Sequence, residues 1–263
     1  MLIGIEHTRR SLRRLIWTGG LLLTVLLIVA AVSRKKELPV RATIVKVKPL
    51  ADGALLIDSA DVIRLVRKST GATLDELRSD LIDEDSIERA LEDDPLVRNA
   101  EVALLANSTV RISVEQRVPL VRIIDKSGVQ YYLDTEGVRM PLSRHVTART
   151  LVATGQIPGY TPDYLDREGR HPLQDLFRLT QFLVADPFWN AMIEQVHLNG
   201  KGEWLLVPKV GDQVVVFGRW DADAEEKFNR LLVFYQEAMS REGWWKYRSV
   251  DLRFRGQVVC QRR

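Results

Sequence analysis

Residues 15–32 read LIWTGGLLLTVLLIVAAV, and none of these side chains is charged. As an α-helix with a rise of about 1.5 Å per residue, the stretch measures about 27 Å, close to the roughly 30 Å hydrocarbon core of a bilayer. An α-helix can cross lipid because it satisfies its own backbone hydrogen-bonding groups. The stretch therefore predicts a transmembrane helix over residues 15–32, with Trp17 at the level of the lipid headgroups.

A cleavable signal peptide is the competing interpretation of the same stretch. An arginine-rich segment precedes it, and residues 28–31 (IVAA) are similar to a small-residue cleavage site. The apolar region of a signal peptide spans about 7 to 15 residues, and this run is longer. Its length therefore favours an anchor that stays uncleaved.

Basic residues flank the predicted helix on both sides, so their count alone does not orient it. The first helix of a chain usually sets the topology, and long domains cross the membrane largely regardless of their own charge. We expect residues 1–14 to form a cytoplasmic tail and residues 33–39 a short tether. The remaining chain is expected outside the cytoplasm, held by a single-pass anchor in the cytoplasmic membrane.

The positive charge of the chain is concentrated beside this predicted helix. Residues 1–48 contain ten Lys and Arg and two Asp and Glu, a balance of +8, whereas the whole chain carries +3, so residues 49–263 carry −5. A basic segment beside a membrane favours anionic headgroups, and a mildly acidic body disfavours binding to nucleic-acid phosphates. Because Cys260 is the only cysteine, the chain can form no internal disulfide, and we expect packing to hold its cores.

The chain between residues 40 and 115 is predicted to form a strand, two helices and two further strands. The spacing of its apolar residues and the capping residues at the helix ends indicate these elements. They are a strand at 40–47, a helix from Asp58 or Ser59 to the residue before Gly71, a helix with a capping box of Asp85 and Glu88 that ends before Pro95, and strands at 97–105 and 109–115 joined through Asn107 and Ser108. In the last strand, Ile112 and Val114 are expected to point into a core, and Arg111 and Ser113 outward.

The second half of the chain begins after a break at Pro119, because proline cannot donate within a central sheet ladder. The elements expected there are a strand at 129–133 with a turn at 134–137, helices over 173–184 and 228–239, the second with a capping box of Asp223 and Glu226, and strands at 195–198, 203–207, 213–217, 249–254 and 257–260. This half is expected to be a mixed α/β domain with a mainly antiparallel sheet. The whole chain is therefore classed as α+β.

Several stretches resemble a known family. Residues 85–91 (DSIERAL) and 94–102 (DPLVRNAEV) resemble the second helix and the following strand of a POTRA domain, and residues 109–119 (TVRISVEQRVP) resemble its last strand with a Glu-x-Arg-x-Pro ending. One POTRA domain directly after one membrane helix is the arrangement of the bacterial cell-division family FtsQ/DivIB. Three further stretches are similar to that family's β-domain, namely 132–138 (YLDTEGV), 151–155 (LVATG) and 250–254 (VDLRF).

The resemblance implies a POTRA domain of β-α-α-β-β order over residues 40–121 and a C-terminal β-domain over residues 122–263. It further implies a scaffold of the division machinery (the divisome) in the inner membrane at the septum, with its bulk in the periplasm. The implied partners are coiled-coil division proteins of the FtsB and FtsL type at the C-terminal strands, and further division proteins at the POTRA domain.

The partner-binding residues that we predict lie in the last two strands. A strand at a sheet edge presents unpaired backbone groups onto which a partner strand can add. The predicted residues are Val250, Leu252, Phe254, Gln257, Val258, Val259 and Cys260. Phe254 is either an aromatic anchor for the partner or a core residue. If the N–H group of Val259 faces the partner, it would donate one hydrogen bond to the partner strand.

A different class of protein is the alternative: a POTRA-bearing chaperone or secretion component that handles exported clients. A transmembrane barrel would then be expected after the POTRA domain, with several alternating strands of about ten residues. The second half carries two long amphipathic helices instead, which favours a compact domain.

Residues typical of catalysis are scattered along the chain. The histidines His7, His145, His171 and His197 have no pair at metal-ligand spacing, and the sequence contains no Gly-x-Ser-x-Gly, no His-Glu-x-x-His and no phosphate-binding glycine loop. The acidic run at 80–88 lacks the central glycine of an EF-hand loop. We expect no enzymatic activity, catalytic residue, metal or cofactor, and an enzyme acting on the cell wall is a third hypothesis.

Overall fold

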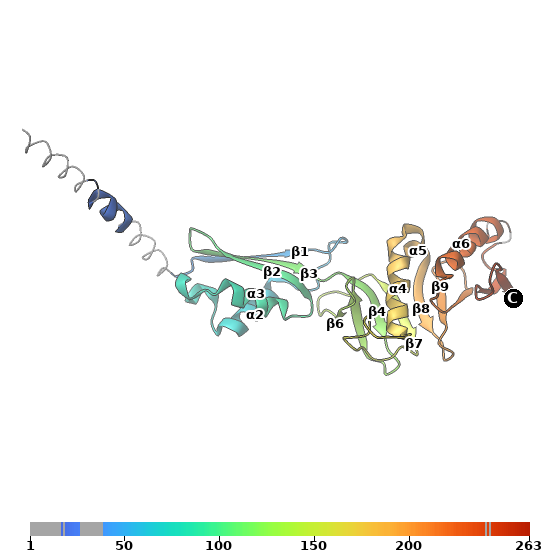
Figure 1. Ribbon diagram of the computed structural model, residues 1–263. Coiled ribbons are helices and arrows are strands. Elements are labelled where there is room, and N and C mark those ends of the chain that lie inside the picture. The colour runs from blue at the N-terminus through green and yellow to red at the C-terminus, as the bar shows by residue number, and fades with distance from the viewer. Residues whose placement is uncertain (1–16, 18, 27–38, 240, 242) are drawn as a thin grey trace, which may run out of the picture. The chain divides into compact units, whose positions relative to one another are not determined.

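The computed structural model describes residues 17, 19–26, 39–239, 241 and 243–263 (Figure 1). Trp17 and residues 19–26 are helical. Within these described ranges, no helix is both long enough and apolar enough to cross a membrane. The predicted tail at 1–14 lies outside the described residues, and so do parts of the predicted membrane helix at 15–32 and of the tether at 33–39.

The described chain folds as two units. Of the described residues, the first unit holds those up to Val47 together with Asp58–Asp93 and Asn99–Val114. The second unit holds Lys48–Ile57, Asp94–Arg98 and Glu115–Arg263.

The first unit is built on a three-stranded sheet with two helices on one face (Figure 1). Its elements are β1 (Ala42–Lys48), α2 (Ser59–Thr70), the 3₁₀ turns η1 (Leu74–Glu76) and η2 (Ser79–Leu81), α3 (Glu84–Glu92), β2 (Val97–Leu104) and β3 (Thr109–Gln116). The strand order is β1-β3-β2, so β1 and β2 are the two edges. The sequence of strand, helix, helix, strand and strand is the predicted one.

Helix α2 begins and ends where the sequence predicts. Asp58 is its N-cap, and its carboxylate accepts a hydrogen bond from the Asp61 backbone N–H at 2.8 Å. Gly71 follows the last residue with φ of 76°, a left-handed conformation that glycine adopts without a Cβ penalty.

Helix α3 starts earlier than predicted, and the capping box of Asp85 and Glu88 is wrong. Asp83 is the N-cap and accepts from the Ser86 N–H at 3.1 Å. Asp85 therefore lies inside the first turn, where acidic residues favour the helix dipole. Glu88 instead accepts a hydrogen bond from the Val102 N–H in β2, at 2.7 Å.

Strand β3 carries the centre of the first unit's core. Ile112 and Val114 are buried and Arg111 is exposed, as predicted, and Ser113 is half-buried. Ser108 has φ of 61° in the reversal between β2 and β3.

The second unit is a nine-stranded sheet with helices packed against it. Its elements are β4 (Pro119–Ile124), β5 (Gln130–Asp134), β6 (Arg139–Met140), β7 (Leu151–Gly155), α4 (Pro172–Ala185), α5 (Pro187–Met192), β8 (Ile193–Leu198), β9 (Trp204–Pro208), β10 (Val214–Gly218), α6 (Ala224–Phe234), the π-helical turn η3 (Tyr235–Met239), β11 (Tyr247–Asp251) and β12 (Val259–Arg262). The strand order is β12-β11-β10-β9-β8-β7-β4-β5-β6. Neighbours are antiparallel except for three parallel pairs, β10 with β11, β7 with β8 and β4 with β7, so the sheet is mainly antiparallel as predicted.

Two features of this unit differ from the sequence-based expectation. Pro119 does mark the end of one strand, but it is also the first residue of β4, a position that tolerates proline. The predicted capping box of Asp223 and Glu226 is wrong, because Asp223 has φ of −91° and ψ of 8° and its side chain makes no cap hydrogen bond. An N-cap residue normally has an extended backbone, which aims its side chain at the first turn.

One hydrophobic core joins the sheet of the second unit to its helices. Trp204 and Phe217 from the sheet are fully buried in it, and so are Leu176 from α4 and Phe228 from α6. The core packs against the central strands, and β12 is the outermost strand at one end of the sheet.

Candidate protein-binding edge

Strand β12 pairs on one side only. It runs antiparallel to β11, with Cys260 opposite Val250 and Val259 opposite Asp251. Among the described residues, no other strand pairs with its outer side. A row of backbone groups therefore lies open at this edge.

The hydrogen bonds of the neighbouring residues indicate which backbone groups face outward. The N–H of Arg263 donates to the Lys246 carbonyl at 3.3 Å, so Arg263 faces β11. The register shifts between Tyr247 and Ser249, but the Leu252 N–H donates to the Val216 carbonyl in β10 at 3.0 Å, so by alternation Asp251 faces β12 and its partner Val259 faces β11. Cys260 and Arg262 direct their N–H and C=O groups away from the sheet. The outward donors therefore belong to Cys260 and Arg262, and not to Val259.

The predicted site residues separate into two groups. Val250 and Leu252 are fully buried, so their side chains belong to the core and do not reach the surface. The others reach the surface: Phe254 (51% exposed), Gln257 (exposed) and Val258 (half-buried) lie in the loop before β12 and not in the predicted strand at 257–260, and Val259 (43% exposed) and Cys260 (half-buried) lie in β12. Burial raises the pKa of the Cys260 thiol.

Phe254 lies in a loop and not in a strand. The predicted strand at 249–254 is too long, because β11 ends at Asp251 and β12 begins at Val259. Within the connecting loop, the Gln257 N–H donates to the Phe254 carbonyl at 3.3 Å. This reversal leaves the Phe254 ring half-exposed in the loop that leads into β12.

Arg253 fixes the loop that carries Phe254. Its guanidinium donates to both carboxylate oxygens of Asp251, at 3.0 and 2.6 Å, and to Glu203 at 2.8 Å. Gly218 makes room for this side chain, because a Cβ there would lie 2.8 Å from the Arg253 Cγ. Arg253 lies within the VDLRF stretch, but the sequence does not indicate its contact with Glu203, which is fifty positions away in the chain.

The ion cluster around Arg253 shifts the pKa of each member. Hydrogen bonds from Asn199 and then from Arg253 lower the pKa of Glu203. Burial acts to raise the pKa of Asp251, but hydrogen bonds from Arg253 outweigh it and the net pKa is lowered. The hydrogen bonds to Asp251 and Glu203 raise the pKa of Arg253, so all three groups are charged at neutral pH.

Two of the histidines have local structural roles. The Nδ1 atom of His197 lies 2.9 Å from the hydroxyl of Thr154 on the neighbouring strand. Burial lowers the pKa of His171, and its ring lies against Tyr164. His7 lies outside the described residues.

Most of this chain, including the start of β12, matches known proteins. The family model "FtsQ/DivIB, C-terminal related" matches residues 118–261, which take in all but the end of the second unit's sheet. Over 218 residues the chain is 31% identical to the Cell division protein FtsQ of Rhodothermus marinus, and the match covers 80% of this chain and 74% of that protein. The chain therefore belongs to the FtsQ/DivIB family of cell-division proteins.

Proposed function

We propose that this chain is a bitopic membrane scaffold that binds and recruits other division proteins outside the cytoplasmic membrane. The observation that carries the proposal is the open side of β12, with the backbone of Cys260 and Arg262 directed outward and Phe254 half-exposed in the loop that leads into the strand. Strand addition at such an edge supplies main-chain hydrogen bonds, and an aromatic side chain supplies an anchor. No catalytic step is part of this function.

The proposed partner at this edge is a coiled-coil division protein of the FtsB or FtsL type. Three arginines lie around the edge: Arg255 in the loop, Arg262 in β12 and Arg263 after it. Arg255 and Arg263 have acidic neighbours, with Asp223 at 3.4 Å and Asp212 at 2.6 Å, whereas Arg262 in β12 has no ion pair among the described residues, so its charge is available to an added strand. The partner segment is therefore expected to carry an acidic residue opposite Arg262.

The first unit and the N-terminus complete the proposed function. The first unit, with its β-α-α-β-β order, is proposed to be a POTRA domain within residues 40–121 that contacts further division proteins. Residues 15–32 are proposed to anchor the chain in the inner membrane at the septum, with residues 122–263 as the periplasmic β-domain. A reporter fused after Arg263 is expected to be active outside the cytoplasm only, and activity inside would reverse this orientation.

Photo-crosslinking in living cells tests the partner site. A photo-reactive amino acid at Phe254 or Val259 is expected to capture an FtsB- or FtsL-type protein, because both side chains are exposed, Phe254 in the loop before β12 and Val259 in β12 itself. The matched control is Val129, equally exposed but in the turn between β4 and β5 at the other side of the sheet. Capture of exported client proteins in place of division proteins would favour the chaperone hypothesis, and equal capture at Val129 would refute a specific edge.

A further inference from the structure

One edge of the first unit's sheet is closed by the chain itself. Three glutamates of α3 accept hydrogen bonds from backbone N–H groups of the edge strand β2: Glu84 from Leu104 at 2.8 Å, Glu88 from Val102 at 2.7 Å and Glu92 from Ala100 at 3.2 Å. These three N–H groups belong to alternate residues, so they are the donors that point away from β3. A partner strand cannot add to β2 while these carboxylates are in place.

The regular spacing of the two elements produces this arrangement. Four residues of an α-helix rise about 6 Å, and two residues of a strand rise about 6.6 Å. Glutamates at every fourth position of α3 therefore have nearly the same spacing as N–H donors at every second position of β2. The two elements run in opposite directions. The three bonds form a ladder that hides the edge.

The opposite edge, β1, has no such cover along most of its length. The Arg41 N–H donates to the Ser108 carbonyl at 2.8 Å, whereas the Val40 N–H donates to Leu77 on the other side at 3.1 Å. By alternation, the N–H groups of Ala42, Ile44 and Lys46 also point away from β3. Apart from the bridge between Pro39 and Arg78, no described segment pairs with this outer side.

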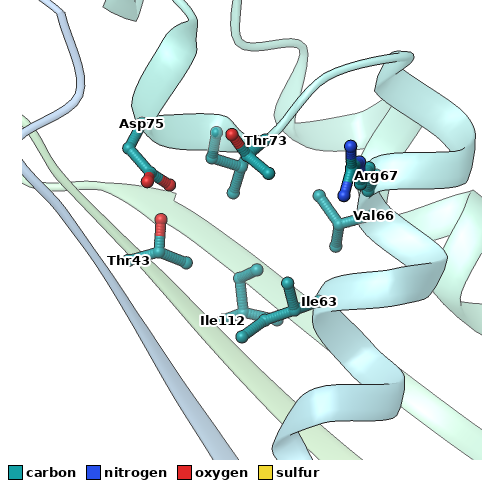
Figure 2. A pocket seen from close by; sticks show the side chains of 8 residues that line it. Thr43, Ile63, Val66, Arg67, Thr73, Asp75 and Ile112 are labelled. Carbon is teal, nitrogen blue, oxygen red and sulfur yellow. The ribbon is translucent and has the colours of Figure 1, made fainter.

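A pocket of about 220 Å³ lies beside this open edge, between β1, α2 and η1 (Figure 2). Ile63, Val66, Leu74 and Ile112 provide its apolar wall. A cavity of about 150 Å³ is known to hold a benzene molecule, so this pocket has room for a leucine- or phenylalanine-sized side chain.

Polar groups stand at the margin of the same pocket. Figure 2 shows the hydroxyl of Thr43 directed toward Asp75, with Arg67 on the other side of the pocket. The Thr43 hydroxyl oxygen is buried, and among the described residues it has no hydrogen-bond partner. A buried hydroxyl without a partner is costly, and a backbone polar group of an added segment could satisfy it.

We propose that the first unit binds an extended segment of another protein along β1, with one apolar side chain of that segment in the pocket. Residues paired across neighbouring strands point to the same face of a sheet, so the residue opposite Thr43 points toward the pocket. This binding surface is distinct from β12 and does not depend on the function proposed for that edge.

The charges of β1 indicate the chemistry of the bound segment. On the face of the sheet away from the helices, Lys46 is exposed and so is Arg111 on the adjacent β3. Cross-strand pairs of opposite charge are favourable and like charges are not. The bound segment is therefore acidic on this face and apolar on the face that enters the pocket, in strict alternation.

Photo-crosslinking of the full chain in cells of the source bacterium tests the proposal. The photo-reactive residue replaces Ile44 on the open edge, and a control replaces the exposed Ala103 on the closed edge. Ile63→Trp fills the pocket from an exposed position of α2, and its matched control, Lys68→Trp, lies on the same helix outside the pocket. Lys46→Glu reverses the charge of the edge, with Lys68→Glu as its control.

The expected result is capture at position 44 of a peptide in which aliphatic and acidic residues alternate, identified by mass spectrometry. Ile63→Trp and Lys46→Glu should each lower that capture at least fivefold, and the two Lys68 variants should leave it unchanged. If Ile63→Trp does not fold, the exposed Lys46→Glu decides alone. The proposal is overturned by absent capture, by equal capture at position 103, by capture of a second copy of this chain, or by capture that neither variant lowers.

Discussion

The guanidinium of Arg253 lies 2.8 Å from the carboxylate of Glu203, and this contact ties the loop that carries Phe254 to the start of β9. The same guanidinium holds Asp251 at the end of β11. The exposed ring of Phe254 therefore belongs to a loop that is held in place at its N-terminal end. A fixed loop binds with less loss of conformational entropy than a free one.

Replacing Arg253 by Leu is expected to weaken partner capture about fivefold to tenfold while changing stability little. The Arg253 side chain is 40% exposed, so solvent limits its ion pairs to about 1 kcal/mol of unfolding free energy. Pull-down titration and thermal melting of the same preparation measure the two effects. Arg253→Lys serves as the control, because it keeps the charge but loses the planar fork, and partial capture is expected. Undiminished capture in Arg253→Leu would show that the loop needs no such support.

The ion cluster makes stability depend on acid pH. The pKa values of Glu203 and Asp251 are lowered from their ordinary 4.5 and 3.8, so the native state binds fewer protons than the unfolded state. Their contribution is therefore fully present above the ordinary pKa values and is lost as pH falls through the lowered ones. Denaturant unfolding between about pH 2 and pH 5 should show stability rising with pH, and Arg253→Leu should flatten that rise. A slope that is the same in both proteins would remove the cluster as its cause.

Local features of this fold could be predicted from the sequence, and long-range ones could not. Asp58 and Gly71 delimit α2 because a cap acts within a few residues, where spacing is visible in the sequence. Glu88 has the spacing of a capping box, yet its carboxylate bonds to Val102, fourteen positions away in the other element. The Glu88 carboxylate could accept either from the start of its own helix or from β2, and only the tertiary structure shows that it accepts from β2.

The candidate edge shows the same limit. The terminal position of the last strand predicted an open edge, and β12 is the outer strand. The predicted strand at 249–254 is too long at its C-terminal end, because β11 ends at Asp251. The sequence pattern does not show that Arg253 bonds to Asp251 and Glu203 and so lies in a loop. The pairing register of β12 with β11 determines which of its N–H groups face outward, and this register cannot be read from a single sequence.

Replacing Glu88 by Ala is expected to cost about 1 to 3 kcal/mol of unfolding free energy, because it leaves the Val102 N–H without its acceptor. Glu88→Gln keeps a carbonyl acceptor and should cost less than half as much. Glu101→Ala, an exposed position on the same β2 strand, is the control and should be near neutral. Chemical denaturation of the three variants measures the differences. Equal losses for Ala and Gln would mean that the hydrogen bond contributes nothing.

Proline substitutions in β12 distinguish its two backbone directions. Cys260→Pro deletes one of the two outward N–H groups, so it should strongly weaken partner capture with a melting temperature close to that of the parent protein. Val259→Pro deletes the N–H directed at β11, so it should lower the melting temperature as well. Melting curves and pull-downs of both variants give the answer. If Cys260→Pro lowered the melting temperature and Val259→Pro did not, the pairing of β12 with β11 would be shifted by one residue from the register described here.

Phe254→Ala is expected to weaken partner binding by about 2 kcal/mol, a loss of roughly thirtyfold in affinity, because truncated interface aromatics commonly cost that much. The ring is 51% exposed and sits in a loop, so its removal opens no core cavity and the melting temperature should stay nearly constant. Phe188→Ala is the matched control: this ring is 39% exposed on α5, away from β12, and its loss should not affect capture. Binding titrations and melting curves of both variants separate the two readings of Phe254. A collapsed melting curve with unchanged capture would make Phe254 a core residue and would remove the anchor from the proposed site.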